Sequence, residues 1–229
     1  MPLVQVTSRE AIDRTIADFS RRASHVYFAQ IGSNDGVRGD PIRRHILRDR
    51  WSGLLVEPVP YLFERLRALY PRRRGLRFEN CAISDRDGVR TLYRLRETDE
   101  KIPGWYEGLA TFFPEVLLKH RWSIPEFEAR VISEPVCCLT LESLFRRHRI
   151  PRLDVFHVDT EGFDGEVLRQ FDFDRFRPSL ILFEHKHLDQ TEREATYARL
   201  RIHGYSISAE PVGGDSLAVR SWRSRFTLR

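Results

Sequence analysis

The chain has 229 residues, of which 41% are apolar and 11% aromatic, and this is enough to bury the core of one α/β domain. We therefore expect a single domain over residues 1–229. No apolar run approaches the roughly 20 residues of a membrane-spanning helix, and the first residues lack the pattern of a secretory signal. These absences predict a cytoplasmic protein that does not contact a membrane.

Charge and cysteine content argue against two further classes of protein. The net charge of +5 comes mainly from arginines, which are spread along the chain with one compact cluster at residues 71–75. This spread does not favour a nucleic-acid partner, which needs a concentrated basic patch with aromatic side chains. The three cysteines, Cys81, Cys137 and Cys138, lack C-x-x-C spacing, which argues against a disulfide framework and a zinc site.

The first part of the chain alternates between helices and short apolar strands. Apolar side chains at helical spacing predict a helix over residues 8–22, with Ser8 as its N-cap, and a buried strand follows over residues 25–31. Helices are then expected at residues 40–50 and 60–70, and strands at residues 52–58, 76–84 and 89–95.

Residues 97–136 interrupt this alternation. They contain four prolines, and their aromatic side chains include Trp105, Phe112, Phe113 and Trp122. A long irregular insert in a compact domain is more often functional than not, although a packed surface excursion is the alternative.

The remainder of the chain returns to regular elements. Helices are expected at residues 139–150, 164–171 and 192–204, parallel strands at 153–159 and 178–185, and a closing antiparallel pair at 205–210 and 215–220. Alternating helices and continuous apolar strands predict an open, doubly wound, mostly parallel α/β sheet with an antiparallel end. Ligands bind beyond the carboxyl ends of the strands in such sheets.

Polar and small residues follow the first three predicted strands. Gly32 and Gly36 bracket a turn that lets the backbone approach a ligand, although a plain surface turn explains it equally well. Glu57 ends the second strand, 25 residues after Gly32, and its carboxylate suits two ribose hydroxyls; an exposed strand end is the alternative. Residues 80–85 suit the wall of an adenine site or a plain core strand. Together, the first two motifs favour a ligand that contains a nucleoside.

Titratable side chains follow the next two strands. His157 and Asp159 share one face of a strand, and His185 ends the neighbouring strand. A cap on the helix at residues 164–171 is the alternative role for Asp159 or Glu161. A metal site would draw on His157, Asp159, Glu161, His185 and His187. No H-x-H or H-E-x-x-H spacing on a defined helix or strand supports such a site, so we expect no metal.

Six segments together resemble one known family: QIGSNDG, LLVEPVP, NCAISD, LTLESLF, DVFHVDTEGFDGEVLR and LILFEH. The series resembles the FkbM-type S-adenosylmethionine-dependent methyltransferases over residues 25–187, with 97–135 unmatched. The segment DTEG…EVL followed by FEH is the specific part. The resemblance implies a seven-stranded Rossmann-like methyltransferase sheet and S-adenosylmethionine as the cofactor.

The resemblance also implies roles for individual residues. Gly32, Ser33 and Asn34 would line the methionine end of the cofactor, Glu57 would bind its ribose, and Asp159 would stand near the reactive methyl group. The cofactor-binding residues expected are Gln30, Gly32, Ser33, Asn34, Asp35, Glu57, Pro58, Ala82, Ile83 and Asp159. Two positions depart from the family pattern, because Gln30 replaces an acidic residue and His157 replaces a lysine.

The implied reaction is in-line methyl transfer to a hydroxyl group of a sugar or natural product, with the insert capping the acceptor site. Trp105 or Trp122 would stack on the acceptor. The expected base is Asp159, followed by His185 and His157. The insert and the antiparallel sheet edge are candidate surfaces for a homodimer.

Two other functions compete with this interpretation. A Rossmann-type NAD-dependent oxidoreductase is disfavoured by the lack of a G-x-G-x-x-G motif and of a tyrosine–lysine pair. A non-catalytic module that binds nucleotides or nucleic acids is disfavoured by the even spread of arginines. Binding of S-adenosylmethionine without binding of NAD separates the first of these from a methyltransferase.

Overall fold

The computed structural model describes residues 4–71, 73–98, 105–211 and 213–220. Their main sheet has eight strands in the order β1–β11–β12–β10–β9–β2–β3–β4. The strands are β1 (Gln5–Val6), β2 (Tyr27–Ile31), β3 (Ser52–Val56), β4 (Leu76–Glu79), β9 (Val155–Val158), β10 (Leu180–Glu184), β11 (Tyr205–Ala209) and β12 (Asp215–Arg220). All neighbours are parallel except β12, which is antiparallel to both β10 and β11. The predicted doubly wound, mostly parallel sheet is therefore confirmed.

The edge of the main sheet differs from the prediction in two ways. The antiparallel strand β12 lies inside the sheet, between β10 and β11, rather than at its end. The short strand β1, which precedes the helix predicted at residues 8–22, pairs with β11. It adds an eighth strand that was not predicted from the sequence.

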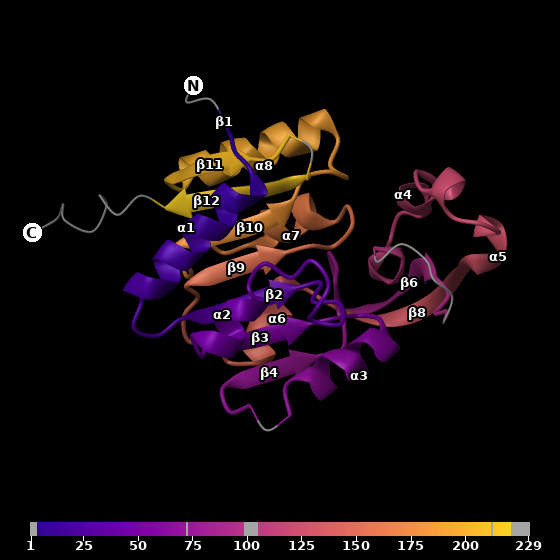
Figure 1. Ribbon diagram of the computed structural model, residues 1–229, viewed down its shortest axis with the longest axis horizontal. Helices are drawn as coiled ribbons and strands as arrows, with labels where there is room; N and C mark the ends of the chain where they lie inside the picture. Colours follow the sequence, from indigo (N-terminus) through magenta and orange to yellow (C-terminus); the bar gives the residue numbers. More distant parts are fainter. Residues whose placement is uncertain (1–3, 72, 99–104, 212, 221–229) are drawn as a thin grey trace, which may run out of the picture.

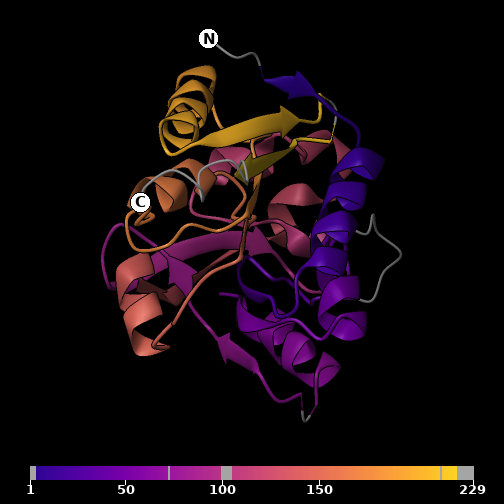
Figure 2. The ribbon, with the colours of Figure 1, turned by 90° about the vertical axis from the view of Figure 1, so that its left-hand side faces the viewer.

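Helices cover both faces of the sheet (Figures 1 and 2). One face packs against α1 (Arg9–Arg22), α2 (Arg43–Arg48) and α3 (Pro60–Leu69), and the other against α6 (Leu141–Arg147), α7 (Asp164–Gln170) and α8 (Gln190–Ile202). Strands buried on both faces read as continuous apolar runs, which is why the pattern was clear in the sequence. None of the helices in the described part of the chain is long and apolar enough to cross a membrane.

Polar side chains define several helix ends. Ser8 caps α1 by accepting from the Ala11 N–H, as predicted, and Thr140 caps α6 in the same way. The N-cap position of α2 is held by Ile42 rather than by Asp40, whose Oδ1 accepts from the N–H groups of Ile42 and of Arg43, the first residue of the helix. The predicted helix at residues 40–50 was therefore too long.

The insert is built on a second sheet, with strand order β5–β8–β6–β7. These strands are β5 (Ala82–Ile83), β6 (Gly88–Leu95), β7 (Ala110–Thr111) and β8 (Val131–Leu139), so the predicted strand at residues 76–84 divides between two sheets. Between β6 and β8 lie the short helices η1 (Tyr106–Gly108), α4 (Pro114–Leu118), η2 (Arg121–Ser123) and α5 (Phe127–Arg130). They project to one side of the main sheet (Figure 1) around their own apolar cluster. Residues 99–104 of the insert, including Pro103, lie outside the described residues.

Candidate functional site

A cavity opens at the carboxyl ends of β2, β3 and β9, where the insert meets the main sheet. Its empty space is about 620 Å³ when the part open to solvent is counted. Predicted site residues that line it are Gly32, Asn34, Glu57, Pro58, Ala82, Ile83 and Asp159. The lining also contains residues that were not individually predicted as site residues: Ile31, Cys81, Leu92, Gly108, Ala110, Phe112, Thr160 and Phe163. Glu161, which was considered only as a cap or a metal ligand, lines the cavity as well.

The turn after β2 depends on the absence of a side chain at Gly32. This residue has a φ of +78°, and a Cβ atom there would lie 1.7 Å from the carbonyl oxygen of Asp159. The N–H groups of Gly32 and Ser33 both donate to the carbonyl of Val56, at 3.0 and 2.9 Å. The turn therefore packs directly between the ends of β3 and β9.

Ser33 is buried in this turn and is not part of the cavity lining. Its hydroxyl donates to the carbonyl of Gln30 at 3.3 Å and accepts from the Val56 N–H at 3.2 Å. The role of Ser33 is thus to tie the turn to β3, which corrects the prediction that it lines the cofactor site.

Glu57 is held by two backbone donors. Its Oε2 accepts from the N–H of Asn34 at 2.8 Å, and its Oε1 accepts from the N–H of Val59 at 2.9 Å. Each carboxylate oxygen has a second lone pair, so both can still accept from a ligand hydroxyl. Burial raises the pKa of Glu57 to about 7, against the opposing effect of the two N–H donors.

Gln30 and Asp35 were also predicted to bind the cofactor, but neither lines the cavity. Gln30 is buried in β2, where it lies opposite His157 of β9. Asp35 accepts from the N–H groups of Val37 and Arg38 and shapes the turn that follows. Successive side chains of a strand point to opposite faces, so Ile31 lines the cavity whereas the preceding residue, Gln30, does not.

Asp159 lies beside Gly32, because its N–H donates to the carbonyl of Ile31 at 2.9 Å. Burial raises the pKa of Asp159 well above its ordinary value, and the nearby carboxylates of Glu161 and Asp164 raise it further. A carboxyl group of this kind binds a proton more readily than an exposed aspartate, so it is suited to general-base chemistry.

The two histidines predicted to act in catalysis do not line the cavity. His157 is buried with Nδ1 unpartnered, and burial lowers its pKa to about 3. Nδ1 of His185 is hydrogen-bonded to the Ser216 hydroxyl at 2.9 Å, which is in turn hydrogen-bonded to the Tyr197 hydroxyl at 2.9 Å. His185 therefore belongs to a buried network with Tyr197 of α8 and lies outside the cavity lining, so the structure does not support its predicted role as a base.

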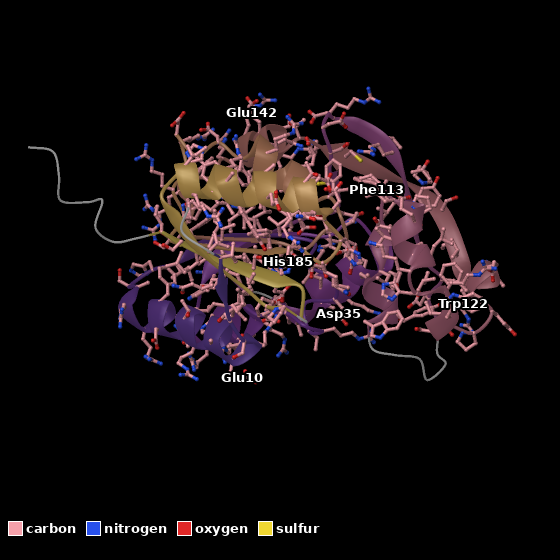
Figure 3. The ribbon with its side chains drawn as sticks, turned by 90° about the horizontal axis from the view of Figure 1, so that it is seen from above. Glu10, Asp35, Phe113, Trp122, Glu142 and His185 are labelled. Carbon is pink, nitrogen blue, oxygen red and sulfur yellow. The ribbon has the colours of Figure 1, made fainter. Side chains whose placement is uncertain are left out.

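The insert contributes a different aromatic side chain from those predicted. Phe112 lines the cavity, whereas Trp122 is 93% exposed at the outer part of the insert, away from Asp35 (Figure 3). Trp105 packs against His120, with ring centroids 4.9 Å apart, and is not part of the lining. The sequence of the insert has no periodicity, so nothing in it distinguished Phe112.

The metal ligands considered from the sequence are only partly brought together. Glu161 and His187 meet, with Oε2 and Nε2 2.9 Å apart, and Glu184 joins them. In the described part of the chain, His157, Asp159 and His185 do not belong to this group.

Comparison with known families matches residues 30–207 to the methyltransferase FkbM domain. The chain belongs to this family. It is therefore an S-adenosylmethionine-dependent methyltransferase, and the interpretations as an oxidoreductase or a non-catalytic module are set aside. A comparison with curated protein sequences finds no match.

One solved FkbM structure agrees with this fold, and two other methyltransferase structures show weaker similarity. The methyltransferase FkbM from Methylobacillus flagellatus KT has a TM-score of 0.53 at 10% identity; the match covers 86% of this chain and 44% of that protein. Precorrin-6y C5,15-methyltransferase from Geobacter metallireducens GS-15 has a TM-score of 0.47 at 11% identity, covering 96% and 94% of the two chains. The N-terminal domain of human METTL16, solved in complex with SAH, has a TM-score of 0.44 at 10% identity, covering 92% and 68%.

Proposed function

We propose that this FkbM domain methylates a hydroxyl oxygen of a small neutral acceptor, such as a sugar or a natural product, within the cavity. The observation that carries the proposal is that Glu57, Asp159 and an apolar wall all line one space at the carboxyl ends of the strands. Bound S-adenosylmethionine supplies an electrophilic methyl group on a sulfonium centre.

The lining suits the two ends of such a cofactor. The Glu57 carboxylate, fixed by two N–H donors, is placed to accept hydrogen bonds from two vicinal ribose hydroxyls. Ala82 and Ile83 are buried apolar side chains that would flank the adenine ring. Gly32 lies against Asp159, and the methionine end would lie on this side of the cavity, with Asn34 also in the lining.

The acceptor side combines an apolar wall with carboxylates. Phe112 and Ala110 of the insert face the cavity, and Asp159 and Glu161 line it from the main sheet. Asp159 would take the proton from the acceptor hydroxyl as the methyl group is transferred. Two carboxylates next to the transfer point repel phosphate groups, so the lining favours a neutral acceptor over a nucleic acid.

Calorimetry tests the cofactor assignment. The wild-type protein is expected to bind S-adenosylhomocysteine and not NAD, and Glu57→Ala is expected to weaken that binding at least tenfold, because the variant loses hydrogen bonds to a charged acceptor. Glu79→Ala is the matched control, since Glu79 ends the neighbouring strand β4 but pairs with Arg147 and His148. Equal affinities in the wild type and Glu57→Ala would show that the ribose assignment is wrong.

Labelled methyl transfer tests the acceptor class. Incubation with labelled S-adenosylmethionine and a panel of sugars and hydroxylated metabolites is expected to label at least one of them on oxygen. Total RNA, offered at the same concentration of methyl acceptors, is expected to remain unlabelled. Labelling of RNA alone would overturn the proposed acceptor class.

A further inference from the structure

Three side chains converge next to the cavity with one free ligand atom each. Glu161 follows β9, Glu184 ends β10, and His187 lies in the turn after β10. Nε2 of His187 is 2.9 Å from Oε2 of Glu161 and 3.7 Å from Oε2 of Glu184. All three atoms lie within 4.8 Å of one another, which is the spacing of ligands around one metal ion.

These atoms are buried and lack hydrogen-bond partners. The His187 side chain is 2% exposed and Glu184 is 9% exposed. Oε2 of both glutamates and Nε2 of His187 make no hydrogen bond, so the contact between Glu161 and His187 is close but not in hydrogen-bonding geometry. Buried carboxylates without a partner are costly, and the cost is removed when a cation binds between them.

The neighbouring lysines do not occupy the point of convergence. Lys186 approaches the other oxygen of Glu184, Oε1, at 3.5 Å, and its side chain is 43% exposed. Lys119 approaches the other ring nitrogen of His187, Nδ1, at 3.5 Å. The carboxyl groups of Asp159 and Asp164 also lie near Glu184, and a bound cation would relieve the repulsion among these groups when they are ionised.

We propose that Glu161, Glu184 and His187 bind a divalent metal ion. Two carboxylates and one imidazole form a mixed oxygen and nitrogen set that suits Mn²⁺ or Zn²⁺. Three protein ligands leave at least one coordination position open, as in catalytic rather than structural metal sites.

The position of this site would let the ion assist deprotonation of the acceptor hydroxyl. Glu161 also lines the cavity, so the open coordination position adjoins the space that the acceptor enters. A divalent cation there lowers the pKa of a nearby hydroxyl group, and this assists its deprotonation. This role rests on the proposed methylation of a hydroxyl, whereas metal binding itself does not.

Calorimetry without cofactor or acceptor tests metal binding independently of methyl transfer. Untagged protein, treated with chelator and desalted, is titrated with MnCl₂ and with ZnCl₂. One ion is expected to bind per chain, and Glu184→Gln and His187→Gln are each expected to weaken its affinity by about tenfold or more. Glu115→Gln, which changes an exposed glutamate of α4, is expected to bind as the wild type does.

Circular dichroism establishes whether each variant is folded before its titration. Glu184→Gln keeps the size of the side chain and removes a buried charge, so its fold is expected to persist. The proposal is overturned if the wild type binds neither ion, or if both variants retain wild-type affinity.

Discussion

The backbone N–H of Asn34 donates to Oε2 of Glu57 at 2.8 Å and so joins the turn after β2 to the carboxylate after β3. The left-handed conformation of Asn34, with φ of +48°, directs this N–H toward the neighbouring strand. The turn therefore helps to hold the Glu57 carboxylate in position, which is its indirect contribution to the proposed cofactor site.

Cofactor affinity is expected to depend on pH through Glu57. Burial raises the pKa of this carboxyl to about 7, and only the ionised form accepts from both ribose hydroxyls. Lowering the pH from 8 to 6 protonates it, so affinity for S-adenosylhomocysteine should fall by about tenfold. Calorimetry at both pH values measures this, and Glu57→Gln should remove most of the dependence. An unchanged dependence in that variant would assign the titration to another group.

Replacing Gly32 should be far more harmful than replacing another glycine with positive φ. In Gly32→Ala, the new Cβ would overlap the Asp159 carbonyl oxygen, at 1.7 Å, in addition to the cost of a left-handed conformation. We expect a loss of about 3 kcal/mol or more in unfolding free energy, measured with urea. Gly39→Ala is the control, because Gly39 also has positive φ but no atom near the added Cβ, so it should lose only about 1 kcal/mol.

Asp159→Asn should impair methyl transfer more than it impairs cofactor binding. Loss of the proton acceptor is expected to lower kcat by about 100-fold or more. His185→Gln should retain kcat, because His185 lies in the network with Ser216 and Tyr197. Initial rates with an identified acceptor measure both variants. Wild-type turnover in Asp159→Asn would exclude this residue as the base.

Stability at acid pH is expected to depend on His157. Burial lowers the pKa of this histidine to about 3, so below about pH 6.5 the unfolded chain binds a proton that the folded chain does not. Its contribution falls by about 1.4 kcal/mol for each pH unit from 6.5 toward 3. In His157→Leu, this slope should be absent from unfolding free energies measured between pH 6.5 and 5.

The exposed His25 provides the control for that experiment. His25→Leu should keep the pH dependence of the wild type. Equal slopes in the wild type and His157→Leu would show that His157 does become protonated in the folded chain.

We expect Glu107 to anchor the insert to the main domain through its ion pairs with two arginines. This buried carboxylate pairs with Arg38 after the glycine turn and with Arg65 of α3 at 3.2 Å. Glu107→Gln is expected to increase cleavage of the insert in limited proteolysis and to raise the KM for the acceptor, with little change in overall stability because both arginines are partly exposed. Glu97→Gln removes the other, exposed partner of Arg65 and should leave both measurements unchanged.

The sequence predicted those parts of the site that follow directly from strand order. Glu57, Ala82 and Asp159 follow strands whose carboxyl ends meet at one edge of a parallel sheet, and all three line the cavity. Ser33 was misassigned because hydrogen bonds to Val56 and Gln30 turn it inward, and these depend on how two strands pair rather than on the local motif.

The remaining errors have two causes. His185 was placed beside Asp159 because the strand was expected to extend to it, but β10 ends at Glu184 and the ring turns toward Ser216. Phe112 was missed because its position follows from long-range contacts, including the 4.0 Å approach of the Arg90 guanidinium to its ring. Neither contact leaves a periodic signal in the sequence.

The pairing of β6 with β8 bears on how acceptor preference can diverge among related enzymes. These strands are in register from Gly88 opposite Cys138 to Leu95 opposite Val131, so the chain leaves and rejoins the methyltransferase core at one place. Segments of different length and composition can be exchanged between the far ends of the two strands without altering the order of the main sheet. We therefore expect that transplanting the insert, which we propose as the acceptor wall, between homologues changes substrate preference and leaves cofactor binding unchanged.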